Sequence, residues 1–207
     1  MKRRHTLQAL LLSPWMAGPA ARAAAPSPRL VSVHSSLTET VYRLGAQDAL
    51  VGTDTTSTYP DAAQRTRKVG YMRTLSAEGV LALQPTAVLA TDDAGPPVVL
   101  SQLQQAGVPV HLLRSTLRFD DVLQKVRVVA RVTQREAQGH ALAAELQARW
   151  SAVQARLQQR PRNAPPRVMF VMAHGGGAMT AGRETAAHAM LQLAGARNAL
   201  EQVNGYR

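Results

Sequence analysis

The apolar positions from residue 29 to residue 114 come in short runs separated by segments of helical period. Four apolar runs predict buried strands, and the segments between them predict helices that begin near Ser36, Ser76 and Gly95. The strands are expected at 29–34, 49–54, 86–92 and 108–114. Strands that alternate with helices through short loops predict a parallel sheet with both faces covered.

The pattern changes at about Asp120, because from there to Gln159 the chain has no proline and one glycine, Gly139. One helix is predicted over 120–133. The sequence TQRE, from Thr133 to Glu136, has the form of a capping box, so a second helix is expected to begin there and to run to about Gln159. This second helix would be roughly 36 Å long at 1.5 Å per residue, which is more than a small lobe needs.

The last part of the chain holds one more strand-helix unit. A strand is expected at 168–173, a glycine-rich loop at 174–185 and a helix at 186–196. One such unit cannot bury both of its own faces, so we expect it to pack on a neighbour or to belong to an incomplete second lobe. The predicted fold class is α/β, with two Rossmann-like lobes bridged by a long helix and the second lobe incomplete.

The first residues have the layout of a secretory signal. Basic residues precede an apolar stretch from Leu7 to Ala17, which falls short of the roughly 20 residues that span a bilayer, and cleavage is expected after about Ala23. The mature chain is therefore predicted to be exported to the periplasm. The chain divides into a signal peptide (1–23), an N-terminal α/β lobe (24–118), a helical segment with the long bridging helix (119–160) and a partial C-terminal α/β lobe (161–207).

Composition narrows the classes of function. The chain has no cysteine, which excludes disulfide scaffolds, thiolate metal sites and thiol catalysis. Residues 1–23 carry four of the 24 basic side chains, so the mature chain has 20 basic and 13 acidic residues and a net charge of +7. An excess of basic side chains first suggests a protein that binds nucleic acid. The basic residues are spread along an exported chain, however, so an anionic small ligand or simple solubility is the favoured interpretation.

Several stretches resemble the periplasmic binding proteins of ABC importers for heme, corrinoids and siderophores, and the heme-importer branch looks closest. The most specific are DTTSTYP at 54–60 and VGYMRTLSAEG at 69–79, and further matching stretches lie at 35–60, 93–110 and 173–200. The resemblance implies two α/β lobes bridged by a long rigid helix, with the ligand in the cleft between the lobes. Family members continue for several more strand-helix units, so this chain resembles a product truncated in its C-terminal lobe.

Tyr71 ends a short Val-Gly run before the helix at Ser76, and Arg73 follows two residues later. Loops at the carboxyl ends of parallel strands line binding crevices, and tyrosine is one of the known axial ligands of heme iron. The resemblance implies that Tyr71 binds the iron. It also implies that Arg73, on the same side of an extended loop, stabilises the phenolate or pairs with a heme propionate. Tyr59, which precedes Pro60, is the rival iron ligand or a residue that lines the cleft.

Other residues are expected near the ligand. His34 and Ser36, at the end of the first strand, are candidates for propionate contacts, and His34 is equally well explained as a histidine at the edge of the core. His174 would come from the second lobe as a second axial ligand or a propionate contact, or be an ordinary loop histidine. Glu78 lies in the first turn of its helix, where the helix dipole stabilises a carboxylate. It resembles the glutamate that docks family members on arginines of the permease.

The predicted function is extracytoplasmic binding of heme and its delivery to the permease of an ABC importer. No enzyme activity and no nucleic acid are expected, and contact with the membrane complex would be peripheral. A cobalamin or ferric-siderophore carrier is the alternative within the class. An exported hydrolase is disfavoured, because the HGGG motif at His174 would need a G-x-S-x-G nucleophile elbow that the sequence lacks. A zinc or manganese carrier would need clustered histidines, and the six here are scattered.

Overall fold

The computed structural model describes residues 28–160, 165–174 and 177–207 of the chain, and the predicted signal peptide lies outside the described residues. The first lobe is built on a four-stranded parallel sheet with the strand order β2-β1-β3-β4. Its strands are β1 (Leu30–Val33), β2 (Leu50–Thr53), β3 (Ala87–Thr91) and β4 (Val110–Leu113). The parallel sheet that the apolar runs predicted is confirmed.

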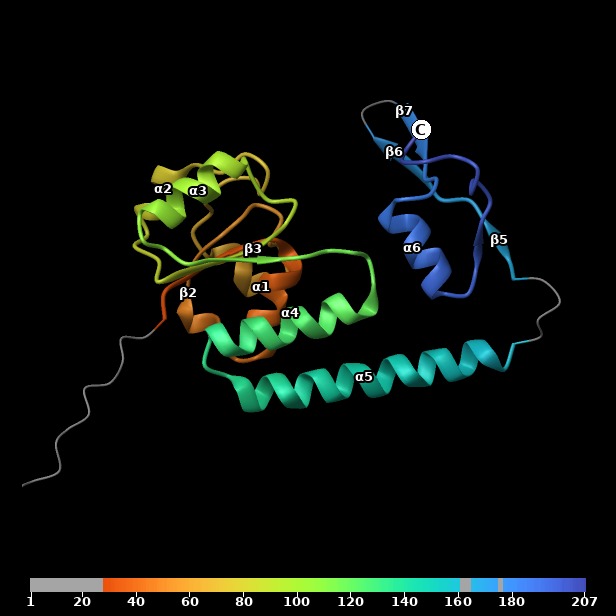
Figure 1. Ribbon diagram of the computed structural model, residues 1–207, viewed down its shortest axis with the longest axis horizontal. Helices are drawn as coiled ribbons and strands as arrows, with labels where there is room; N and C mark the ends of the chain where they lie inside the picture. The colour runs from red at the N-terminus through yellow and green to blue at the C-terminus, as the bar shows by residue number, and fades with distance from the viewer. Residues whose placement is uncertain (1–27, 161–164, 175–176) are drawn as a thin grey trace, which may run out of the picture.

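Helices cover both faces of this sheet, with α2 and α3 on one side and α1 and α4 on the other (Figure 1). Successive side chains of a strand point to opposite faces. In β1, Val31 and Val33 therefore join one core, while Leu30 joins the other. The helices and 3₁₀ turns of the lobe and the helix that follows it are α1 (Ser35–Arg43), η1 (Gln47–Ala49), η2 (Asp61–Arg65), α2 (Ala77–Leu81), α3 (Pro97–Gln105) and α4 (Phe119–Val132).

The long bridging helix is α5 (Glu136–Gln158), and its 23 residues confirm the predicted long helix. It packs against α4 at Gly139, where an added Cβ would overlap the Cβ of Ala130. The one glycine of this helical segment thus occupies a position where a side chain would push two helices apart. The close approach of α4 and α5 depends on it.

The predicted capping box at Thr133 is wrong. Thr133 is the C-cap of α4, and its hydroxyl donates to the carbonyl oxygen of Val129 at 2.8 Å. The N-cap of α5 is Arg135, which makes no side-chain capping bond. The last carbonyls of α4 also need hydrogen-bond partners, and the Thr133 hydroxyl lies within reach of them. It therefore serves the end of one helix and not the start of the next.

The second lobe departs from its prediction in the strands. The expected strand at 168–173 is split into β5 (Arg167–Val168) and β6 (Val171–His174), and the expected loop contains β7 (Gly177–Thr180). β6 and β7 pair antiparallel, whereas β5 pairs in parallel with β8 (Arg197–Asn198). The two ends of the apolar run therefore belong to different sheets. The helix expected after the loop is confirmed as α6 (Ala186–Leu193).

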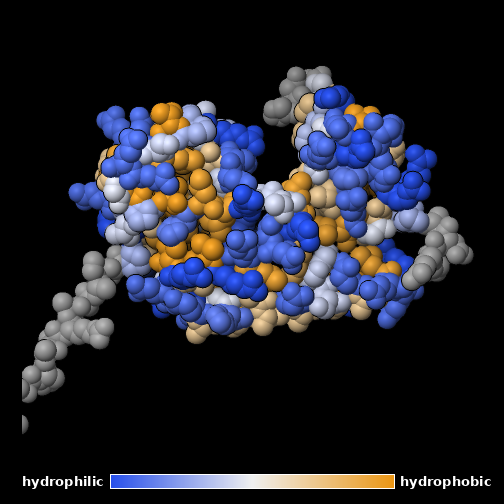
Figure 2. All heavy atoms as spheres, in the orientation of Figure 1, coloured by the Kyte–Doolittle hydropathy of each residue, from blue (hydrophilic) through white to orange (hydrophobic). Residues whose placement is uncertain are grey.

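The two lobes stand side by side on α5, which runs beneath both of them (Figure 1). Gly195 of the second lobe lies on Leu157 of α5, since a Cβ built at Gly195 would lie 3.0 Å from a Leu157 methyl carbon. The chain leaves β4 toward the second lobe before it turns back into α4 (Figure 1), so the carboxyl edge of the sheet faces that lobe. Figure 2 shows a notch between the two lobes. Across residues 28–160, 165–174 and 177–207, no helix is long and apolar enough to span a bilayer.

We expect Gly139→Ala to lower the free energy of unfolding by about 1–3 kcal/mol, the usual range for an overpacked core. The added methyl group would meet Ala130. Gly79→Ala is the matched control, because Gly79 also lies in a helix and the nearest atom to its added Cβ is 3.7 Å away. Urea unfolding followed by circular dichroism measures both variants. Equal stability of the two variants would contradict the close-packing role of Gly139.

The second lobe buries little apolar surface. Ala181 is fully buried, but several larger apolar side chains of this lobe are between 36% and 64% exposed: Met169, Phe170, Val171, Met172 and Met190. Burial of apolar area stabilises by about 25 cal/mol per Å², so these exposed side chains contribute little to the lobe's stability.

Limited proteolysis should therefore leave a fragment that ends near Gln159 while residues 165–207 are cut away. Mass spectrometry of the time course identifies the fragment. Persistence of the uncut chain for as long as this fragment would show that the second lobe is as stable as the first.

Candidate functional site

The buried Asp54 carboxylate organises the carboxyl edge of the first sheet. Oδ1 accepts from the backbone N–H of His34 at 3.0 Å and from the Ser57 hydroxyl at 2.7 Å. Oδ2 accepts from the backbone and the hydroxyl of Thr56 at 3.0 and 2.6 Å. Asp54 is fully buried, and each of its two carboxylate oxygens accepts two hydrogen bonds. It joins the end of β1 to the loop after β2 and fixes the shape of the DTTSTYP stretch.

Lys68 holds the other side of the same loop. Its ammonium group donates to the Thr53 hydroxyl at 2.9 Å and to the carbonyl oxygens of Ser57 and Ala63 at 2.8 and 3.1 Å. Burial lowers the pKa of Lys68, and the charge of Asp54 opposes that shift. Asp54 and Lys68 together give the loop a fixed backbone, on which Tyr59 is presented at 65% exposure.

His34 caps the first helix through its ring. Its Nδ1 accepts from the backbone N–H of Ser36 at 3.1 Å and lies 2.9 Å from the Ser36 hydroxyl. The backbone of His34 has φ 119°, a conformation that non-glycine residues adopt rarely and that occurs preferentially at functional sites. Since Nδ1 accepts a hydrogen bond, the proton of the neutral ring lies on Nε2. That tautomer presents a donor, which suits an anionic group better than a metal ion.

The ring of His34 lies among charged groups from several elements. Burial lowers the pKa of His34, and Lys125 and Arg73 lower it further, while Asp93 and Asp54 act to raise it. Lys125 comes from α4 and Asp93 from the loop after β3. Charged groups at the carboxyl ends of β1 and β3 therefore interact with a charged group of α4, the helix that covers this face of the sheet.

Tyr71 and Arg73 lie in a tight turn and not in the extended loop that the sequence suggested. The amide of Thr74 donates to the carbonyl oxygen of Tyr71 at 2.9 Å. Met72 is 5% exposed, whereas Tyr71 is 42% exposed and Arg73 is also exposed. Burial of the residue between them leaves both polar side chains at the surface. The turn leaves Tyr71 and Arg73 exposed at the same edge of the sheet, and their roles toward a ligand stay predictions.

The turn is tied to the loop after β3. The amide of Gly95 donates to Met72 at 2.9 Å, and the amide of Leu75 donates to Gly95 at 3.0 Å. The Arg73 guanidinium pairs with the Asp93 carboxylate at 3.3 Å. Oδ1 of Asp93 also accepts from the buried Thr91 hydroxyl at 2.6 Å. Burial acts to raise the pKa of Asp93, but the hydrogen bonds from Thr91 and Arg73 and the charge of His34 outweigh it and hold that pKa below its usual value.

The remaining predicted residues lie in three places. Ser36 is joined to His34 as described, and Glu78 is exposed in the first turn of α2, where the sequence placed it. The backbone of His174 ends β6 in the second lobe, and its side chain lies outside the described part of the chain. The structure thus gathers Tyr71, Arg73 and His34 at the carboxyl edge of one sheet.

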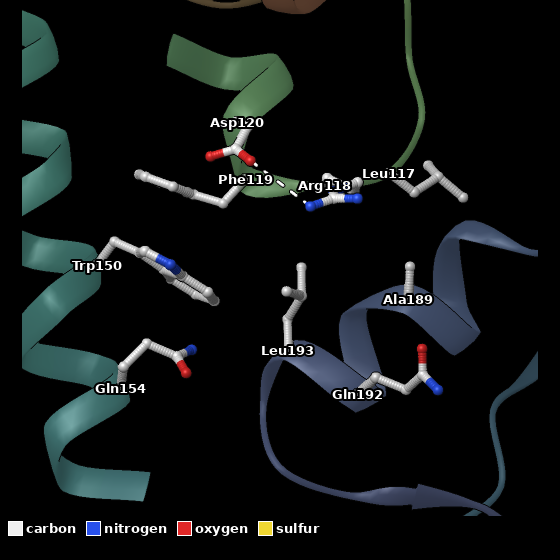
Figure 3. A pocket seen from close by; sticks show the side chains of 9 residues that line it. All are labelled: Leu117, Arg118, Phe119, Asp120, Trp150, Gln154, Ala189, Gln192 and Leu193. Atoms are coloured by element: carbon white, nitrogen blue, oxygen red, sulfur yellow. Dashed lines mark ion pairs between the residues drawn. The ribbon is translucent and has the colours of Figure 1, made fainter.

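A separate cavity of about 400 Å³ lies between the two lobes, beside the bridging helix (Figure 3). It is lined by residues 117–120 at the start of α4, by Trp150 and Gln154 of α5 and by one face of α6. The rings of Phe119 and Trp150 stack there with centroids 4.8 Å apart. None of the residues predicted from the sequence lines this cavity, so it is distinct from the edge that carries Tyr71 and Arg73.

Sequence reasoning missed Asp93, Lys125 and Asp54 as members of the edge. Asp54 and Asp93 had a usable signal, because each directly or almost directly follows a buried strand, where parallel sheets present their polar groups. Lys125 had no such signal. It lies in the middle of α4 and reaches the edge through the packing of that helix, with its Nζ 2.9 Å from the Ser115 hydroxyl.

The chain belongs to the periplasmic binding protein family, whose model matches residues 30–207. Proteins of this family are binding components of transport systems and not enzymes.

Among solved structures, the chain is similar to the periplasmic heme-binding protein BhuT in complex with two hemes. The identity is 41%, the TM-score is 0.81, and the match covers 87% of this chain and 70% of that one. It is also similar to the periplasmic heme-binding protein RhuT from Roseiflexus sp. RS-1, at 34% identity and a TM-score of 0.79 over 87% and 70% of the two chains.

A cobalamin-binding protein of Halobacterium salinarum is 33% identical over 178 residues, which are 85% of this chain and 47% of that protein. The chain spans about half the length of the curated relatives it matches.

The lowered pKa of His34 predicts how stability changes with pH. The unfolded ring takes up a proton near pH 6.5, whereas the folded ring does so only at lower pH. The unfolded state therefore binds more protons as the pH falls below 6.5, and the free energy of unfolding should fall from pH 7 to pH 5. His34→Asn keeps an acceptor for the Ser36 amide and should flatten this dependence. Urea unfolding at each pH measures the effect.

His140→Asn, on the exposed face of α5, is the control for a histidine substitution away from the edge. A pH dependence that persists in His34→Asn and flattens in His140→Asn would overturn the assignment to His34.

Proposed function

We propose that this chain binds heme outside the cytoplasm and passes it to the permease of an ABC importer. The observation that supports this most is that an exposed phenol, Tyr71, and an exposed guanidinium, Arg73, lie in one turn at the sheet edge that faces the second lobe. The relatives with solved structures named above bind heme, at identities up to 41%. These solved relatives and the chemistry of this edge favour the same ligand.

Tyr71 is the proposed ligand of the heme iron. A phenolate oxygen is a hard anionic donor of the kind that ferric iron accepts. A free phenol has a pKa near 10, so binding must displace its proton, and a nearby cation favours the anion. Arg73 supplies that cation two residues away. A binding protein needs affinity for the heme iron and no chemical reaction, because it carries its ligand unchanged.

Heme also brings two propionate groups, and the edge has donors for them. Arg73 offers a planar fork that pairs with a carboxylate, and the Nε2–H of His34 offers a further donor. Ser36 holds the ring of His34 in that orientation. His174 remains a proposed contact from the second lobe.

Cobalamin is the alternative ligand, because the 33%-identical relative from Halobacterium salinarum is a cobalamin-binding protein. A corrinoid already carries cobalt and has no need of a phenolate ligand from Tyr71. The two ligands are therefore separable by whether binding depends on that phenol.

The proposed partner is the permease of an importer, with Glu78 as the contact on the first lobe. Glu78 is exposed in the first turn of α2, a position where the helix dipole interacts favourably with a carboxylate. Arginine is the residue type that pairs best with such a carboxylate. Export to the periplasm would follow from cleavage of the signal peptide after about Ala23.

The test is a titration of the purified mature chain with hemin, followed by its visible spectrum. Wild type should show a tyrosinate-to-iron charge-transfer band. Tyr71→Phe keeps the ring but removes the ligand oxygen, so it should lose this band and bind hemin at least about tenfold more weakly, or about 1.4 kcal/mol.

Tyr59→Phe is the matched control, since it removes the rival phenol in the same way. It should keep the band. A band lost in Tyr59→Phe and kept in Tyr71→Phe would move the ligand to Tyr59. A wild-type chain that binds cyanocobalamin and leaves the hemin spectrum unchanged would replace heme by the corrinoid.

A further inference from the structure

Several charged groups lie near Asp93, and the fold brings them together from separate elements. Arg73 comes from the turn before α2, His34 from the end of β1, and Lys125 from the middle of α4. Asp93 lies among them, paired with Arg73 at 3.3 Å and bonded to the buried Thr91 hydroxyl at 2.6 Å. The Asp93 carboxylate is thus paired with one cation, Arg73, and lies near the His34 ring, on which the charge of Lys125 also acts.

Lys125 is connected to this group from the far side. Its Nζ donates to the Ser115 hydroxyl at 2.9 Å, and the amide of Ser115 donates to Asp92, the neighbour of Asp93, at 3.2 Å. Lys125 also lines the same hollow of about 210 Å³ as Ser36, which is hydrogen-bonded to the His34 ring.

The ion pair between Arg73 and Asp93 is one that can be exchanged. The side chains are 61% and 43% exposed, and ion pairs in such surroundings contribute little to stability. Asp54, by contrast, is buried with its oxygens occupied by several donors. Of these two carboxylates near His34, Asp93 is the one whose partner a carboxylate from solution can take over.

We propose that Asp93 is the internal counterion of a carboxylate-binding site formed by Arg73, Lys125 and His34, and that a ligand carboxylate displaces it from Arg73. This inference rests on the proposed function, because it makes the free propionates of heme the feature that the edge selects. Asp93 keeps Arg73 over the edge in the empty protein, where Thr91 fixes the carboxylate. On binding, the guanidinium turns to the ligand and Asp93 keeps its bond to Thr91.

If Asp93 competes with the ligand for Arg73, weakening Asp93 should raise the affinity for hemin. Asp93→Asn removes the negative charge, while the amide can still bond both Thr91 and Arg73. Hemin affinity should therefore rise, by roughly twofold to fivefold, the range that an exposed ion pair carries. The affinity for hemin dimethyl ester, which has no free carboxylate, should not change.

Asp48→Asn is the matched control. It makes the same change of charge just before β2, at the amino end of the sheet. Its affinities for hemin and for the diester should equal those of wild type. A loss of hemin affinity in Asp93→Asn, or an equal change for hemin and the diester, would overturn the counterion role.

A second measurement keeps this inference separate from the proposed function. In the ligand-free chain, Asp93→Asn should lower the pKa of the His34 ring, followed by NMR, because Asp93 acts to raise it. Asp48→Asn should leave that titration in place. If wild type fails to bind hemin, the proposed function is wrong. The His34 titration then tests by itself whether Asp93 and His34 interact in the ligand-free chain. If the pKa of the His34 ring is the same in Asp93→Asn as in wild type, the proposed interaction between Asp93 and His34 is wrong as well.

Discussion

The site depends on one buried carboxylate. Asp54 accepts hydrogen bonds from the end of β1 and from its own loop, and no water is needed to satisfy it. A buried charge of this kind is tolerable only when donors surround it, so the positions of His34, Thr56 and Ser57 are fixed together. The unusual backbone of His34 follows from this constraint. The ring of His34 then caps α1 through Nδ1.

The backbone of the turn that carries Tyr71 and Arg73 is placed mainly by burial of neighbouring residues. Tyr71 and Arg73 are surface residues, but Met72 and Leu75 anchor their turn in the core, and Gly95 bonds it to the next loop. Such a site is rigid at its backbone and adaptable at its side chains. That combination suits a carrier, which must hold its ligand and also release it unchanged.

Much of the first lobe was predictable because its strands are short apolar runs bounded by turns, as in β1 and β3. The second lobe was not. A continuous run from Val168 to Ala173 resembles one buried strand, and nothing in it marks the break that sends Val168 and Val171 to different sheets. The small residues of β7 also lack the pattern of a strand. At the site, Tyr71 and Arg73 could be placed from strand ends, while the contribution of Lys125 required the packing of α4.

The stacked pair of Phe119 and Trp150 has a consequence for optical work on this protein. The sequence has two tryptophans, and Trp15 lies within the predicted signal peptide. The mature chain would then emit from one indole, placed beside the cavity that separates the start of α4 from α6 (Figure 3). A porphyrin absorbs where tryptophan emits, so energy transfer from this ring would report how far the ligand lies from the bridging helix, without any added label.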